Sequence, residues 1–273
     1  MVPYNVKVIT FPDLTRQVRV YSSTVIPPFK FVQRSVRDRN PFDGKACSEI
    51  LCDLDGWQYH VDAVSLSRTK RKIYDLARSN IWDWFVTFTF DSKKVDRYDY
   101  DSCVSKLSKW FNNLKRSSPG LAYLVVPERH KDGAWHFHGL FSGLDEDEVV
   151  WSGRYVVKRV RGAGRSRFIK TSEKIYQIGR YKLGWMTATR VRHKDRVTSY
   201  ITKYVTKDML DGLYGRKRYW SSRNLLVPSE EVFDLDEVDR FILGSDLAEK
   251  ASFQKVSSVS YGDMTQSVSI FEL

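Results

Sequence analysis

The chain has 273 residues, 42% of them hydrophobic, and a formal net charge of +12. This composition excludes a disordered or fibrous chain and allows one sizeable domain with extensions, or two small domains. The three cysteines lack CxxC spacing, which argues against a disulfide framework, and no apolar run approaches the length of a membrane span. Because the first residues also lack the basic and apolar regions of a signal peptide, we expect an intracellular protein.

Charge is unevenly distributed along the chain. Residues 151–224 carry 20 lysines and arginines against 4 acidic residues, whereas residues 225–273 carry 3 against 10. The basic block favours a polyanionic partner such as a nucleic acid. We expect an N-terminal extension at 1–80, a catalytic domain at 81–213, and a C-terminal extension at 214–273 that is first basic and then acidic.

Hydrophobic periodicity predicts a mixture of strands and helices. Alternation near 6–10 and 18–21 favours short strands, and the spacing over 62–80 favours a helix. The elements expected in the central domain are a strand at 84–90, an amphipathic helix at 99–116, strands at 121–126 and 134–141, a flexible basic loop at 161–170, a strand at 185–192 and a helix at 199–210. Residues 234–238 of the acidic tail favour a further helix that packs on the core.

Two strands enclose a turn at 131–133 and form a hairpin that brings metal-binding residue types together. Its pairing places Glu128 directly opposite His136. Because side chains alternate faces along a strand, His138 joins that face, while Phe137 points into the opposite layer. Two imidazoles and one carboxylate suit a divalent ion such as Mn²⁺ or Mg²⁺, and Zn²⁺ is chemically possible. An isolated His-x-His pair is more often structural, but the facing carboxylate favours a metal site.

A second motif follows about sixty residues later and reads Tyr200-Ile201-Thr202-Lys203-Tyr204-Val205-Thr206-Lys207. In a helix, residues three and four apart share a face, so both tyrosines and both lysines would form one stripe. A tyrosine hydroxyl has a pKa of about 10, so its attack on phosphorus needs a metal-polarised phosphate or a neighbouring ammonium. The alternative is the solvated face of an amphipathic helix, which explains the lysines but not two exposed tyrosines.

Three motifs in order resemble the HUH endonucleases, specifically the two-tyrosine rolling-circle replication initiators (Rep proteins) of bacteriophages and plasmids. The first is the strand-forming segment 85–90, the second is His136-Phe137-His138, and the third is the segment 200–207. The resemblance covers roughly residues 80–224. In the conjugative relaxases, a related group, the tyrosine precedes the histidines, so the order found here favours the initiators.

The resemblance implies an α+β fold with a central antiparallel β-sheet, of ferredoxin-like or RRM-like type, and flanking helices. It also implies two groups of site residues, the metal ligands Glu128, His136 and His138 and the catalytic residues Tyr200, Tyr204, Lys203 and Lys207. The metal would be Mn²⁺ or Mg²⁺, and cleavage would leave a 5′-phosphotyrosine and a free 3′-hydroxyl. Each tyrosine fits the single-tyrosine pattern equally well, so the order of cleavage stays open.

Cations and aromatic rings are interleaved in two parts of the basic block, where cations can follow phosphates and rings can stack on unpaired bases. The candidate DNA-binding residues are Arg159, Arg161, Arg165, Arg167, Arg216, Lys217, Arg218 and Trp220. The expected partner is single-stranded DNA at a replication origin, including a hairpin. Because no G-x-x-x-x-G-K-[ST] loop occurs, we expect no nucleotide cofactor, and a helicase and polymerase supplied by a bacterial host cell.

Two alternatives stay open beside a metal-dependent nickase and strand transferase that starts rolling-circle replication and rejoins the strand to end it. A two-tyrosine rolling-circle transposase would use the same residues, although such enzymes tend to be longer. A non-catalytic nucleic-acid-binding protein is the third possibility, and the intact ligand and tyrosine motifs argue against it.

Overall fold

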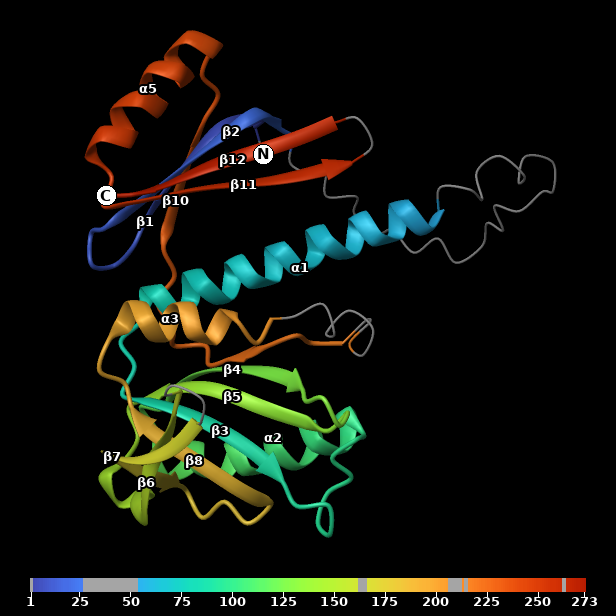
Figure 1. Ribbon diagram of the computed structural model, residues 1–273, viewed down its shortest axis with the longest axis vertical. Helices are drawn as coiled ribbons and strands as arrows, with labels where there is room; N and C mark the ends of the chain where they lie inside the picture. The colour runs from blue at the N-terminus through green and yellow to red at the C-terminus, as the bar shows by residue number, and fades with distance from the viewer. Residues whose placement is uncertain (1, 27–53, 162–165, 206–212, 214–215, 262–263) are drawn as a thin grey trace, which may run out of the picture. The chain divides into compact units, whose positions relative to one another are not determined.

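The computed structural model describes residues 2–26, 54–161, 166–205, 213, 216–261 and 264–273. The chain forms two compact units, one made of residues 65–226 and the other of residues 1–64 together with 227–273. One unit contains an antiparallel sheet of seven strands and the other an antiparallel sheet of five, each accompanied by helices (Figure 1). The predicted α+β fold class is confirmed.

The seven-stranded sheet has the order β6-β7-β8-β3-β5-β4-β9 and carries the candidate site. Its strands are β3 (Trp84–Phe90), β4 (Ala122–Arg129), β5 (Trp135–Ser142), β6 (Val149–Arg161), β7 (Ser166–Ile178), β8 (Gly184–Arg190) and β9 (Trp220–Ser221). The accompanying helices are α1 (Leu54–Ser79), α2 (Tyr100–Ser117), the 3₁₀ turn η1 (Glu146–Glu148) and α3 (Lys194–Thr202). No described helix is long and apolar enough to cross a membrane.

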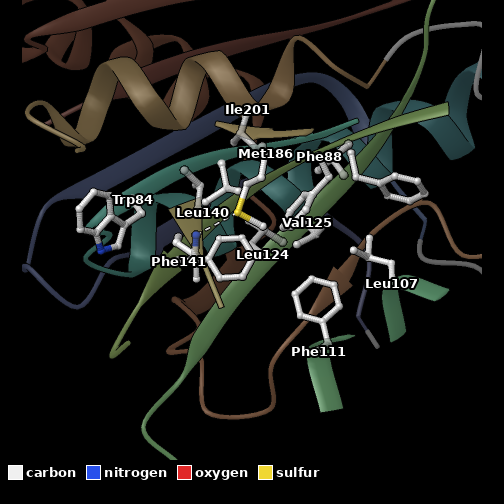
Figure 2. Packing of buried hydrophobic residues seen from close by; sticks show 14 of the residues in the cluster. Trp84, Phe88, Leu107, Phe111, Leu124, Val125, Leu140, Phe141, Met186 and Ile201 are labelled. Carbon is white, nitrogen blue, oxygen red and sulfur yellow. Dashed lines mark hydrogen bonds between the residues drawn. The ribbon is translucent and has the colours of Figure 1, made fainter. Parts of the chain in front are cut away.

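One face of the sheet is covered by α2 and forms the main core. Along β3 buried and half-buried residues alternate strictly, as the predicted strand at 84–90 requires. The carboxylate of Asp99 accepts a hydrogen bond from the amide of Ser102 at 2.9 Å and so caps α2 close to the predicted start. Phe111 of α2 packs against Phe88 and Phe141, with ring centroids 6.1 and 5.9 Å away (Figure 2). The backbone of the site is therefore anchored by aromatic packing.

The segment expected to be a flexible basic loop at 161–170 is mostly strand, which corrects that expectation. Strands β6 and β7 pair over most of their length as an antiparallel hairpin, and only residues 162–165 between them lie outside the described part. Residues 157–160 and 167–170 are exposed on both faces of the hairpin. A strand exposed on both faces needs no alternation of polar and apolar residues, so its period of two was invisible in the sequence.

The second unit joins the two ends of the described chain in one sheet, with the order β10-β1-β2-β12-β11. Its elements are β1 (Tyr4–Thr10), β2 (Arg16–Val25), β10 (Ser229–Phe233), α5 (Glu237–Lys250), β11 (Phe253–Tyr261) and β12 (Met264–Glu272). Val6, Val18, Leu247 and Phe271 form its small buried core. The predicted acidic-tail helix is present as α5, but Leu247 joins it to this second core rather than to the core of the central domain.

Candidate active site

The candidate site is built on the β4–β5 hairpin, whose register is the one that the turn predicted. Glu128 pairs with His136, and His138 follows on the same face of β5. Gly133 reverses the chain with a φ of 84°, and its amide donates to the carbonyl of His130 at 2.8 Å. A glycine suits this turn because residues with a Cβ atom rarely adopt a positive φ.

Strand β3 adds two threonines that hold the imidazoles. Thr87 lies opposite His138 and Thr89 lies opposite His136. The Oγ1 atom of Thr87 is 3.1 Å from Nδ1 of His138, and Oγ1 of Thr89 is 3.5 Å from Nδ1 of His136. Bonds at Nδ1 fix the ring orientation and leave the Nε2 atoms for another partner. Sequence reasoning assigned no role to these threonines, although their alternation with aromatic residues was visible.

Glu128 completes the chain of contacts through His138. Its Oε2 atom lies 2.7 Å from Nε2 of His138. This hydrogen bond holds the pKa of the Glu128 carboxyl below its ordinary value, against the opposing effect of burial. The pKa of His136 is also lowered, chiefly because burial disfavours the charged imidazolium. An ionised carboxylate and a neutral imidazole are the forms that metal ligands need.

His130 is a further imidazole beside this group that the candidate list omitted. Its ring stacks on that of His136, with centroids 5.1 Å apart. Its Nδ1 atom is also 3.1 Å from Oδ1 of Asp132 in the turn. Positions 128 and 130 share a face if β4 is continued past its last residue, so strand alternation held the signal.

The donor set of Glu128, His136 and His138 fits the chemistry of a divalent cation, since it offers two imidazoles and one carboxylate. The threonine bonds are of the kind that orients metal-bound histidines. Within the described residues, no three His, Cys, Asp or Glu side chains already converge in metal-binding geometry. Binding therefore requires the His136 ring, now stacked on His130, to approach the bonded pair of Glu128 and His138.

Helix α3 carries Tyr200 over the face of the sheet opposite to α2 (Figure 1). It begins at Lys194 and ends at Thr202, so the prediction of a helix over 199–210 was wrong at its start and in its described end. The amides of residues 203, 204 and 205 donate to carbonyls three residues earlier, at 3.1 to 3.4 Å. This 3₁₀ pattern winds the chain more tightly, so Tyr204 leaves the helical stripe expected from its spacing.

Both tyrosines lie beside the histidines. The ring of Tyr204 stacks on that of His138, with centroids 3.6 Å apart and planes 10° from parallel. Tyr200 meets Tyr204 edge to face at 5.4 Å and is 45% exposed. Burial and, next, a hydrogen bond with Tyr200 raise the pKa of the Tyr204 phenol. The Nζ atom of Lys203 lies 5.4 Å from the centre of the Tyr200 ring, while Lys207 lies outside the described residues.

Phe85 is a second residue whose role sequence reasoning missed. Its ring centroid lies 5.2 Å from that of Tyr200, 6.3 Å from that of Tyr204 and 6.1 Å from that of His138. It is an aromatic residue of β3 on the same face as Thr87. Phe85 therefore forms the apolar seat on which the two tyrosines rest.

The predicted DNA-binding residues fall in two separate places. Arg159 and Arg167 are exposed on the β6–β7 hairpin. Arg161 ends β6, but its side chain lies outside the described part of the chain, as does the whole of Arg165. The four other candidates are Arg216, Lys217, Arg218 and Trp220, which line an open pocket of about 670 Å³.

The pocket cations are partly engaged within the protein. Arg216 forms an ion pair with Asp101 at 2.8 Å. Arg218 donates to the hydroxyl of Ser65 at 2.7 Å, and the carbonyl of Lys217 accepts from a tyrosine of α2 at 2.6 Å. These contacts fix the strand-edge segment in place, so the exposed cations of the hairpin are the less constrained of the two groups.

Comparison with known proteins gives one match. Residues 83–209 match the model of a family of replication-associated proteins, described as Replication-associated protein ORF2. The matched segment begins just before β3 and includes the β4–β5 hairpin and both tyrosines. No curated protein and no solved structure gives a significant match. The family agrees with the resemblance to replication initiators inferred from the three motifs.

Proposed function

We propose that this chain, whose residues 83–209 match the replication-associated protein family, starts rolling-circle replication by nicking one DNA strand through a phosphotyrosine. One observation carries the proposal beyond a general role in replication. The Tyr204 ring contacts His138 at 3.6 Å, and Tyr200 adjoins Tyr204 at 5.4 Å. Two hydroxyl nucleophiles therefore lie next to side chains suited to hold a metal ion.

In the proposed reaction the phenol oxygen of Tyr200 or Tyr204 attacks the phosphorus of the scissile phosphodiester. A bond forms between the tyrosine oxygen and phosphorus, the bond from phosphorus to the 3′ oxygen breaks, and the phenol proton ends on that 3′ oxygen. The products are a 5′-phosphotyrosine and a 3′-hydroxyl that a polymerase can extend. Because one phosphodiester replaces another, neither cleavage nor rejoining consumes ATP.

The remaining side chains prepare the phosphate and the nucleophile. Glu128, His136 and His138 would hold the divalent ion, Mn²⁺ or Mg²⁺, which when bound polarises the phosphate and offsets its developing charge. Thr87 and Thr89 hold the imidazole rings at Nδ1, so that the Nε2 atoms are left for the ion. This arrangement lets the ring positions be set by the rigid strand β3 rather than by the ligand.

The lysines are proposed to assist the tyrosines. The ammonium of Lys203, 5.4 Å from the Tyr200 ring centre, would stabilise a developing phenolate or the leaving oxygen. Lys207 is proposed for the same role beside Tyr204. Because a phenol is mostly protonated at neutral pH, a nearby positive charge favours the reactive form.

Two tyrosines allow the reaction to end as well as to begin. One tyrosine would hold the 5′ end while the other attacks the site regenerated by a round of synthesis, and each rejoining frees one as the other is loaded. Their rings lie 5.4 Å apart, which suits alternate use of one phosphate position. A rolling-circle transposase would use the same exchange, but the match to a replication-associated family favours replication.

The test is covalent capture of DNA. The full chain is incubated with a pool of single-stranded oligonucleotides and Mn²⁺ and analysed on a denaturing gel for a protein–DNA species. We expect the species to form with Mn²⁺, to be lost in EDTA, and to be absent from the Tyr200→Phe/Tyr204→Phe double variant. The control is Tyr98→Phe, since Tyr98 is an exposed tyrosine of the same unit. Undiminished product in EDTA would exclude the metal, and product from the double variant would exclude these nucleophiles.

A further inference from the structure

The outer part of the β6–β7 hairpin is a two-stranded ribbon, here defined as residues 157–160 and 167–170. The ladder pairs Lys158 with Ile169, Arg159 with Phe168, and Val160 with Arg167. Strand β7 pairs with β8 at one position only, between Tyr176 and Ala188, so the described register gives the ribbon no further sheet neighbour. All eight ribbon residues are exposed.

The two faces of the ribbon have the same chemical composition. Directly opposed residues of an antiparallel pair share a face. One face presents Val157, Arg159, Phe168 and Lys170, and the other presents Lys158, Val160, Arg167 and Ile169. Each face therefore carries two cations and two apolar side chains, and no acidic residue occurs among these eight positions.

An uncovered ribbon of this kind is expected to have a partner. Phe168 is 74% exposed and Val157 55% exposed, although an isolated two-stranded hairpin is only marginally stable in water. At the base of the ribbon, Lys170 lies 4.3 Å from the ring centre of Tyr155 and Lys174 lies 5.2 Å from that of Trp151. These contacts support the stem while leaving the outer residues uncovered.

We propose that the ribbon enters the major groove of double-stranded DNA and holds the duplex beside the nicked strand. This inference rests on the proposed function and adds a second DNA substrate form, the duplex, to it. The major groove of B-DNA is wide enough for a two-stranded ribbon and has a phosphate backbone along each wall. Cations on both faces match two phosphate walls, and the exposed apolar side chains match the thymine methyl groups on the groove floor.

The same features argue against single-stranded DNA as the occupant. Proteins that bind single strands combine a basic groove with several aromatic rings on which successive bases stack. Among the eight ribbon residues, Phe168 is the one aromatic side chain. A single strand would also need cations on one face of the ribbon, whereas here they are divided equally between both faces.

The experiment uses the full chain and a mixed-sequence duplex of about 30 base pairs, with affinity measured over a range of salt concentrations. Two variants each remove one face, Lys158→Gln/Arg167→Gln and Arg159→Gln/Lys170→Gln. The control is Lys106→Gln/Lys109→Gln, two exposed lysines of α2. Each phosphate contact contributes about 0.9 to the slope of log affinity against log salt, so each ribbon variant should lower the slope by about 1.8 and the control should not.

A second measurement locates the groove. The same duplex carrying glucosylated 5-hydroxymethylcytosine, whose sugars fill the major groove, should bind the wild-type protein no better than the unmodified duplex binds a ribbon variant. Filling the minor groove with the ligand netropsin should leave wild-type affinity unchanged. Full binding to the glucosylated duplex, or a loss of slope in only one face variant, would overturn the proposal.

Failure of the ribbon proposal can be told apart from failure of the proposed nicking activity. Both ribbon variants should retain Mn²⁺-dependent adduct formation on single-stranded oligonucleotides at the wild-type level. If their loss were confined to single-stranded binding, the ribbon would hold the nicked strand and the duplex proposal would be wrong. If the wild-type protein formed no adduct but bound the duplex through both ribbon faces, the nickase would be wrong and the ribbon proposal would stand.

Discussion

Strands β3 and β5 present two unlike faces, although adjacent residues of the same strands supply both. On the face covered by α2, Phe88, Phe137 and Phe141 are fully buried (Figure 2). On the opposite face, Thr87 and His138 share a hydrogen bond, and the tyrosines rest against the histidine. The period of two thus lets one short segment stabilise the fold and present reactive groups.

The contrast teaches how a small site can be rigid without being apolar throughout. Burial of large side chains is the dominant favourable term in folding, and here the aromatic face supplies it. The polar face also contains an apolar part, since Leu140 of β5 and Ile201 of α3 are fully buried in the main cluster (Figure 2). The helix is therefore seated by packing, and the polar side chains are free to serve chemistry.

The largest effect should come from exchanging neighbours on the two faces. Phe137→Ala should lower the free energy of unfolding by about 3–5 kcal/mol, because it opens a cavity in the aromatic core. His136→Ala should cost less than about 1.5 kcal/mol, because it removes a half-buried ring with one long hydrogen bond. Urea unfolding measures both. His136→Ala should nevertheless abolish the Mn²⁺-dependent adduct, and equal losses of stability in the two variants would contradict the division between faces.

A second effect concerns the close packing around Gly139. A Cβ atom placed there would lie 2.5 Å from Cε2 of Phe141 and 2.9 Å from Cγ2 of Val125. Gly139→Ala should therefore destabilise the protein by about 1–3 kcal/mol through overpacking. Gly120→Ala is the matched control, because its added atom would meet an ordinary contact at 3.7 Å. Similar unfolding midpoints for the two variants would show that the aromatic face is more plastic than this account allows.

Local patterns carried the parts of this arrangement that the sequence could predict. The pairing of Glu128 with His136 followed from a tight turn and strand alternation, both of which act over a few residues. The contact of Thr87 with His138 was not predictable in the same way, because it requires β3 to lie beside β5. The sequence contains no local signal for that neighbourhood. The second sheet, whose strands come from both ends of the described chain, was missed for the same reason.

The limits of helical spacing are equally instructive. The stripe predicted for the tyrosine helix assumed regular α-helical geometry through Tyr204, but the helix ends at Thr202. The hydroxyl of Thr202 donates to the carbonyl of Ser199 at 2.8 Å, and the following amides bond three residues back. Spacing predicted which residues meet at the site, whereas the contact of Tyr204 with His138 depends on this tightened turn.

The third prediction tests whether the threonines act through the histidines. Thr87→Val keeps the shape of the side chain but removes the hydrogen bond to Nδ1 of His138. We expect Mn²⁺ affinity, measured by calorimetry, to fall by roughly 10–100-fold, as for other partners of metal-bound histidines. Thr187→Val, on β8 opposite Thr87, is the control. An unchanged affinity in Thr87→Val would mean that the histidine orientation is set by packing alone.

The smallest effect should come from the charge beside Tyr200. Lys203→Gln should slow adduct formation several-fold, since a cation near an exposed ring contributes on the order of 0.5–1 kcal/mol. The loss should be greater in the Tyr204→Phe background, where Tyr200 is the remaining nucleophile, than in the Tyr200→Phe background. Equal rate losses in both backgrounds would assign Lys203 to DNA binding rather than to assistance of Tyr200.

The most direct test of the central claim is to identify the residue that carries the DNA. The adduct formed with Mn²⁺ is digested, and the peptide bearing the nucleotide is mapped by mass spectrometry in the wild-type protein and in each single Tyr→Phe variant. The account predicts nucleotide on Tyr200 or Tyr204 in the wild type, and on the remaining tyrosine in each variant, with no adduct when His138 is replaced by alanine. Nucleotide on any other residue, or an adduct that survives the loss of His138, would contradict it.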